Sequence, residues 1–90
     1  MDADVLAART REYAAKGLLP SGIVRALFRE FGEFSAVHLI VCFSTAYGIF
    51  GGDIGHFFAA WWPDAHDSIP DREFDDGLLK AIRRSVDERA

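Results

Sequence analysis

Cysteine is almost missing from this 90-residue sequence, since Cys42 is the only one. A single thiol excludes an internal disulfide framework and a cysteine-rich metal site, and it favours a reducing compartment. A signal-peptide start is also missing, because the opening MDADVL is acidic and no apolar segment follows it. We therefore expect a cytoplasmic protein.

Basic residues are outnumbered, with 10 Lys and Arg against 14 Asp and Glu and a net charge of −4. This balance is poor for holding a polyanionic backbone, so we expect no nucleic-acid partner. Long hydrophobic runs are missing too, because the apolar stretch 34–50 is shorter than the roughly 18 to 20 residues that span a bilayer. With 50% hydrophobic and 27% charged residues, the composition predicts one globular domain over residues 1–90 and no membrane association.

The charge that is present gathers in one stretch. Residues 51–76 carry seven acidic side chains and one arginine, which gives −6, whereas residues 77–90 carry four basic and two acidic side chains, which gives +2. The negative potential is therefore concentrated in the second half of the chain, where it favours attraction to a basic partner.

Hydrophobic periodicity, capping residues and glycine stops predict a chain made of helices. The expected helices are residues 2–16, a second from a Ser21 cap to Gly32, a third at about 36–47, a fourth from an Asp53 cap to Pro63, and a last one from a Ser68 cap to about Arg89. Gly77 weakens the last helix, so a break near Asp76 is one alternative.

The third segment, AVHLIVCFSTAY, also has the composition of a buried strand. Its twelve residues lie between Ser35 and Gly48, which is long for a strand, and no partner strand exists. The pattern of an aromatic residue, a glycine and a phenylalanine two residues after the glycine occurs twice, at residues 31–34 and 47–50. It indicates two similar helix ends, at which the phenylalanine can fold back on the last turn of the helix. We therefore predict an all-α, compact bundle of four to five short helices around a central apolar helix at about 36–47.

Cys42 and His38 lie four residues apart, on one face of the predicted third helix. This is the minimal geometry for a histidine-activated thiolate. The segment is the most apolar in the chain, and a thiol buried there is inert. We therefore expect Cys42 to be a core residue and expect no enzyme activity.

The residues His56, Asp64, His66 and Asp67 include the ligand types of a zinc site. Their spacing matches no metal motif, because a helix end, a proline and a loop separate the two histidines. We expect neither a metal nor another cofactor.

Two adjacent tryptophans precede most of the acidic residues and define the expected partner-binding surface. Because neighbours on a helix point to different faces, one tryptophan should face the core and the other should be exposed. Exposed tryptophan beside carboxylates is typical of protein interfaces. The alternative is a solvated acidic loop with both indoles covered. The predicted partner-binding residues are Trp61, Trp62, Asp64, Asp67, Asp71, Glu73, Asp75 and Asp76.

The pairs Phe31-Gly32 and Tyr47-Gly48, the Trp61-Trp62-Pro63 stop and the acidic segment after it together resemble small helical bacterial immunity partners of polymorphic toxins. The resemblance implies a non-enzymatic protein that binds a toxin or enzyme stoichiometrically and blocks its active site. We expect a protein partner with a basic surface, and either a monomer or a homodimer. Two alternatives are a phage-encoded inhibitor or nucleic-acid mimic, and a homo-oligomeric helical adaptor.

Overall fold

The computed structural model describes residues 3–63 and 65–89, with side chains to residue 87. These residues form five α-helices and no strand, which confirms the predicted all-α fold. The helices are α1 (Ala3–Ala15), α2 (Pro20–Phe31), α3 (Ala36–Tyr47), α4 (Gly51–Ala60) and α5 (Asp71–Arg89). None of them is long and apolar enough to cross a membrane.

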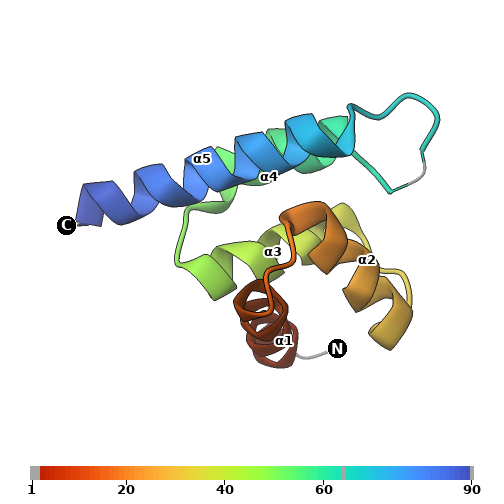
Figure 1. The fold of residues 1–90 in the computed structure, drawn as a ribbon, viewed down its shortest axis with the longest axis horizontal. Coiled ribbons are helices and arrows are strands. Elements are labelled where there is room, and N and C mark those ends of the chain that lie inside the picture. Colours follow the sequence, from red (N-terminus) through yellow and green to blue (C-terminus); the bar gives the residue numbers. More distant parts are fainter. Residues whose placement is uncertain (1–2, 64, 90) are drawn as a thin grey trace.

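The helices are arranged in two layers (Figure 1). The long helix α5 and the shorter α4 run side by side across one layer, and α1, α2 and α3 form the other. A short turn at residues 48–50 joins α3 to α4, whereas a longer loop, residues 61–70, leads from α4 into α5.

The core draws on every helix. Leu6 from α1, Leu27 from α2, Phe43 from α3, Phe58 from α4 and Phe74 from α5 belong to one buried cluster. The rings of Phe43 and Phe58 are stacked 5.3 Å apart, and Phe58 meets Phe74 edge-on at 5.2 Å. Aromatic contacts therefore join the two layers through the centre of the molecule.

Helix α3 has the bounds that its flanking residues predict. The Ser35 side chain accepts a hydrogen bond from the backbone N–H of His38, and Gly48 ends the helix in the left-handed conformation (φ 65°, ψ 35°). The expected folding back of a phenylalanine after each glycine is correct for Phe34, which packs edge-on against Phe28. It is wrong for Phe50, which is 77% exposed.

The three other predicted caps are wrong. Helix α2 begins at Pro20 and not after Ser21, α4 begins at Gly51 with Asp53 inside its first turn, and α5 begins at Asp71. The Ser68 hydroxyl donates to the carbonyl of Ala65 in the loop instead of capping α5. Helix α5 also continues through Gly77 without a break.

Two helix ends are satisfied by side chains from other helices. The Asp75 carboxylate of α5 accepts from the Ser21 backbone N–H at 2.7 Å and from its hydroxyl at 2.8 Å, so it caps the start of α2. Arg11 of α1 donates to the carbonyls of Ala46 and Thr45 at the end of α3. These contacts tie the ends of helices to distant parts of the chain.

Candidate partner-binding surface

Trp61 lies in the core at the end of α4, where it is 1% exposed. Its indole stacks on Phe74 with ring centroids 3.9 Å apart, and its Nε1–H donates to the Asp71 carboxylate at 2.9 Å. The chain leaves helical geometry at this residue (φ −120°, ψ 134°), which turns the side chain inward. The expectation that one tryptophan faces the core is therefore correct, and the assignment of Trp61 to the binding surface is wrong.

Asp71 is held by α2 and by the residue that follows α4. Arg25 of α2 donates to both of its carboxylate oxygens, at 2.7 and 3.1 Å, and Trp61 donates to one of them. These hydrogen bonds, chiefly those from Arg25, lower the pKa of Asp71. The side chain is still half exposed, but its charge is already paired with that of Arg25.

Asp75 is only 5% exposed and is engaged in capping α2. The prediction that it contacts a partner is therefore wrong for this structure. Burial of a carboxylate is tolerated here because both of its oxygens accept hydrogen bonds from Ser21.

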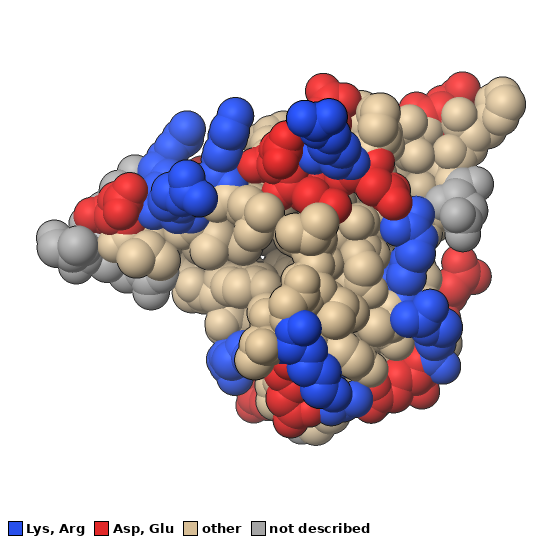
Figure 2. Space-filling model, viewed as in Figure 1, with Lys and Arg blue, Asp and Glu red and all other residues tan. Residues whose placement is uncertain are grey.

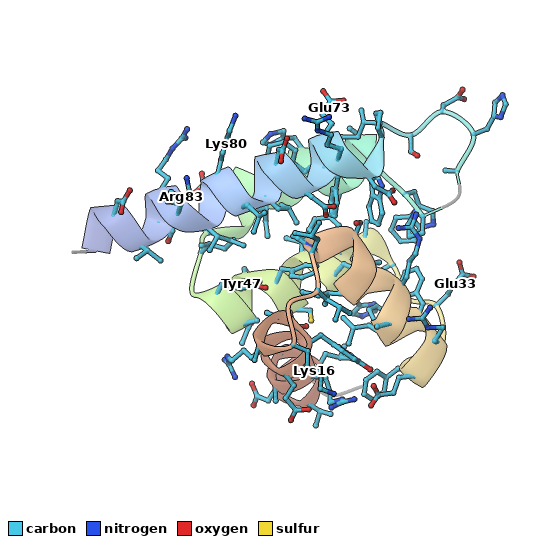
Figure 3. The ribbon with its side chains drawn as sticks, in the orientation of Figure 1. Lys16, Glu33, Tyr47, Glu73, Lys80 and Arg83 are labelled. Atoms are coloured by element: carbon cyan, nitrogen blue, oxygen red, sulfur yellow. The ribbon has the colours of Figure 1, made fainter. Side chains whose placement is uncertain are left out.

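Asp67, Glu73 and Asp76 are the predicted acidic residues that are exposed and that no described side chain of the fold engages. Within residues 3–63 and 65–87 no salt bridge engages any of them. Asp64 lies outside the described residues. Figure 2 shows acidic side chains over the first half of α5 and basic ones over its second half, and Glu73 points away from the core in Figure 3.

Trp62 is half buried, and of these three acids Asp67 lies near it. One side of its indole meets the Phe28 ring, 5.8 Å away, which itself contacts Phe34. A hollow of about 280 Å³ lies against the indole, and Ala59, Ala60, Ala65, His66, Asp67 and Ser68 complete its lining. Trp62 therefore matches the predicted exposed tryptophan more closely than Trp61, and we use the term acidic face for Trp62, Asp67, Glu73 and Asp76.

A groove between α4 and α5 adjoins Glu73 and Asp76. Its apolar floor is Phe57, which packs against Gly77, and its volume is about 540 Å³. Pro70, Arg72 and Lys80 complete the lining together with the two acids. Sequence reasoning missed this groove, and its only signal was a glycine in the middle of an amphipathic helix.

Cys42 is fully buried, as predicted. Its Sγ lies 3.0 Å from the Thr10 hydroxyl, and burial raises the pKa of the thiol. His38 is exposed and its Nδ1 lies 3.0 Å from the Ser35 hydroxyl. The two residues therefore occupy different environments, and this thiol is unsuited to nucleophilic attack.

Among the residues that the structure describes, the possible metal ligands do not gather at one site. In the part of the chain that the structure describes, no three His, Cys, Asp or Glu side chains are gathered for a metal ion. His56 lies against the Phe57 ring, 4.0 Å between centroids, whereas His66 belongs to the loop beside Trp62.

Comparison of the chain with protein-family models, curated proteins and solved structures found no match. The resemblance to immunity proteins therefore stays a prediction.

Proposed function

We propose that this protein is a non-enzymatic, protein-binding inhibitor of the immunity type, which binds a basic surface of its target through the acidic face. The observation that carries the proposal is that Asp67, Glu73 and Asp76 are exposed and have no described salt bridge, whereas Asp71 and Asp75 are engaged within the fold. Their charge is therefore available to a partner.

The acidic face combines long-range attraction with an aromatic contact. Exposed carboxylates on a molecule of net charge −4 accelerate the encounter with a basic target. Trp62, already packed on one side against Phe28, presents its remaining surface with little side-chain freedom to lose on binding. Electrostatic attraction would set the association rate, and the contact of the Trp62 indole would set the dissociation rate.

An inhibitor of this kind needs no catalytic group of its own. It would act by stoichiometric occupation of the target, as the resemblance to immunity proteins implies. We also retain the expectation of a cytoplasmic location for the complex.

The proposal is tested by recovering the target with the tagged protein and measuring binding kinetics at two ionic strengths. The triple variant Asp67→Asn, Glu73→Gln, Asp76→Asn should associate more slowly and with a weaker dependence on salt. Trp62→Ala should dissociate about thirtyfold faster, as for an anchor worth about 2 kcal/mol. Addition of the wild-type protein should abolish the target's activity at a one-to-one ratio.

A matched control separates the acidic face from net charge. The triple variant Asp4→Asn, Asp53→Asn, Asp87→Asn removes the same charge from exposed residues outside the face. It should keep most of the wild-type association rate. An equal loss in both triple variants would contradict the assignment of the face, and a bound target that stays fully active would contradict inhibition.

A further inference from the structure

Another hollow lies between α4 and α5, next to the groove that adjoins Glu73 and Asp76. Its volume is about 320 Å³, at the lower end of the roughly 300 to 1,000 Å³ of small-molecule sites. Neither Glu73 nor Asp76 lines it. Two cations, a histidine and one carboxylate share its lining with an aromatic ring. We call it the basic hollow and define it by Gly52, Asp53, His56, Phe57, Lys80 and Arg84.

The basic hollow is lined by one face of each of two helices that run side by side (Figure 1). Lys80 and Arg84 lie one helical turn apart, so their side chains share one face of α5. On α4 the spacing i, i+3, i+4 places Asp53, His56 and Phe57 on one face as well. A ligand in the hollow would therefore meet side chains from both helices.

The two cations of the basic hollow are not engaged by the described fold. In the part of the chain that the structure describes, no salt bridge includes Lys80 or Arg84. Asp53 lines the same hollow, and none of these salt bridges joins it to either cation. Figure 3 shows Lys80 projecting from α5 on the side away from α1, α2 and α3. Both positive charges are therefore available to an anion.

The donors of the basic hollow suit a tetrahedral dianion. A guanidinium donates through a planar fork, and an ammonium adds a second positive charge. The N–H groups in the first turn of a helix have no acceptor within the helix, and Gly52 lies in the first turn of α4. His56 adds a ring nitrogen. A carboxylate has two oxygens for these donors, whereas a phosphate monoester has three and carries nearly two charges at neutral pH.

We propose that the basic hollow binds a small phosphate monoester. The phosphate lies between Lys80 and Arg84 and accepts from the backbone N–H of Gly52 at the start of α4. The organic part of the ligand lies against the Phe57 ring, which supplies an apolar wall. None of the residues of the acidic face lines the basic hollow, so this inference is independent of the proposed function.

Asp53 gives the proposal an expectation of opposite sign. Its carboxylate repels the anion that Lys80 and Arg84 attract. At 0.1 M ionic strength, charges further than about 10 Å away are largely screened, so the charges in the lining matter more than the net charge of −4. Removal of the Asp53 charge should therefore tighten binding, and removal of either cation should weaken it.

The test is an NMR titration of the isotope-labelled full chain with phenyl phosphate at about pH 7.5, where the phosphate is a dianion. Because the charged side chains of the hollow are exposed, we expect a dissociation constant on the order of 0.1 to 1 mM. The amide signals of Gly52 and His56 should shift most. Lys80→Gln and Arg84→Gln should each weaken binding about tenfold. Asp53→Asn should tighten it about threefold.

Two matched controls separate the hollow from the general charge of α5. Arg83→Gln removes one positive charge from a neighbouring residue that does not line the hollow, and it should change binding by less than about twofold. Benzoate has the ring of phenyl phosphate but a planar, singly charged head group, and it should bind about tenfold more weakly. Circular dichroism must show that each variant keeps the helical spectrum of the wild type.

Four results would overturn the proposal. They are no detectable binding of phenyl phosphate, equal effects of Arg83→Gln and Arg84→Gln, weaker binding by Asp53→Asn, and binding of benzoate as tight as that of phenyl phosphate. Binding to phosphatidylcholine vesicles that contain phosphatidic acid, without binding of phenyl phosphate, would count equally against it, because the phosphate would then belong to a lipid surface.

Discussion

A side chain at position 77 would occupy the space that the Phe57 ring fills. An ideal Cβ there would lie 2.2 Å from Phe57 Cε1 and 2.5 Å from its Cζ. Gly77 has no positive φ and lies inside α5, so its backbone conformation does not require glycine. The close contact between α4 and α5 is what requires it.

This contact predicts that Gly77→Ala has opposite effects on stability in the presence and in the absence of the Phe57 ring. Gly77→Ala should lower the free energy of unfolding by about 1 kcal/mol or more, although alanine is the better helix former, because the added methyl displaces the Phe57 ring. In a Phe57→Ala background the same change should raise it by up to about 1 kcal/mol. Urea unfolding of the four proteins measures both effects, and a stabilising Gly77→Ala in the wild type would contradict the close contact.

At the scale of helices, α2 begins without a local cap. The backbone of Leu19 precedes the helix, no side-chain cap is formed there, and Asp75 supplies the missing acceptor from α5. Its two hydrogen bonds satisfy a backbone N–H and a hydroxyl of Ser21 that would otherwise be buried without a protein acceptor. The stability of α2 is therefore coupled to the docking of α5.

Asp75→Ala should consequently destabilise the protein by about 1 to 2 kcal/mol, the usual loss for an N-cap. Asp76→Ala, at the exposed neighbouring position, should change the free energy of unfolding by less than about 0.5 kcal/mol. Thermal or urea unfolding compares the two. If both variants lost the same free energy of unfolding, the loss would come from removing an acidic residue from α5 and the Asp75 cap would contribute nothing.

The difference between a local and a remote cap explains which helix starts could be predicted from the sequence. Ser35 and Gly48 bound α3 through local hydrogen bonds and backbone geometry, and both are recognisable in the sequence. The acceptor for α2 is 54 residues from Ser21, and no local pattern points to it. The cap of α3 was therefore predictable because its partner is local, whereas the acceptor for α2 was not predictable because it comes from another helix.

The candidate surface was predictable in part for a similar reason. Adjacent tryptophans must diverge, but which one enters the core depends on α4 ending at Ala60 and on Phe74 and Asp71 receiving the indole. An acidic residue is visible in a sequence, whereas its engagement by Arg25 or Ser21 is a tertiary property. Composition alone could not separate exposed acids from those used by the fold.

At the scale of the whole molecule, one core shared by five helices should unfold as a unit. Acidic residues contribute unequally to the stability of the folded state. Arg25 lowers the pKa of Asp71, and Arg9 lowers that of Glu30, so these carboxylates stabilise the folded state while they are ionised. Their contribution is complete above the unfolded-state pKa of about 4 and is lost as the pH falls through the lower folded-state value.

Acidification should therefore destabilise the wild type more than Asp71→Asn, because the variant has no charge to lose at this position. The difference should stay below about 1 kcal/mol, since Asp71 is half exposed and solvent screens its ion pair. Urea unfolding followed by tryptophan fluorescence at pH 6, 4 and 3 measures it. Asp67→Asn, at an acid without a described salt bridge, should keep the wild-type dependence, and identical curves for all three proteins would contradict the role of Asp71.

The remote cap on α2 also has a consequence for synthesis. Ser21 is added to the growing chain 54 residues before Asp75, a delay of about 3 to 10 s at 5 to 20 residues per second. During that interval α2 has an uncapped first turn, and its apolar face lacks the helix that will cover it. The last helix to be synthesised therefore supplies both the acceptor at the start of the second helix and part of its cover.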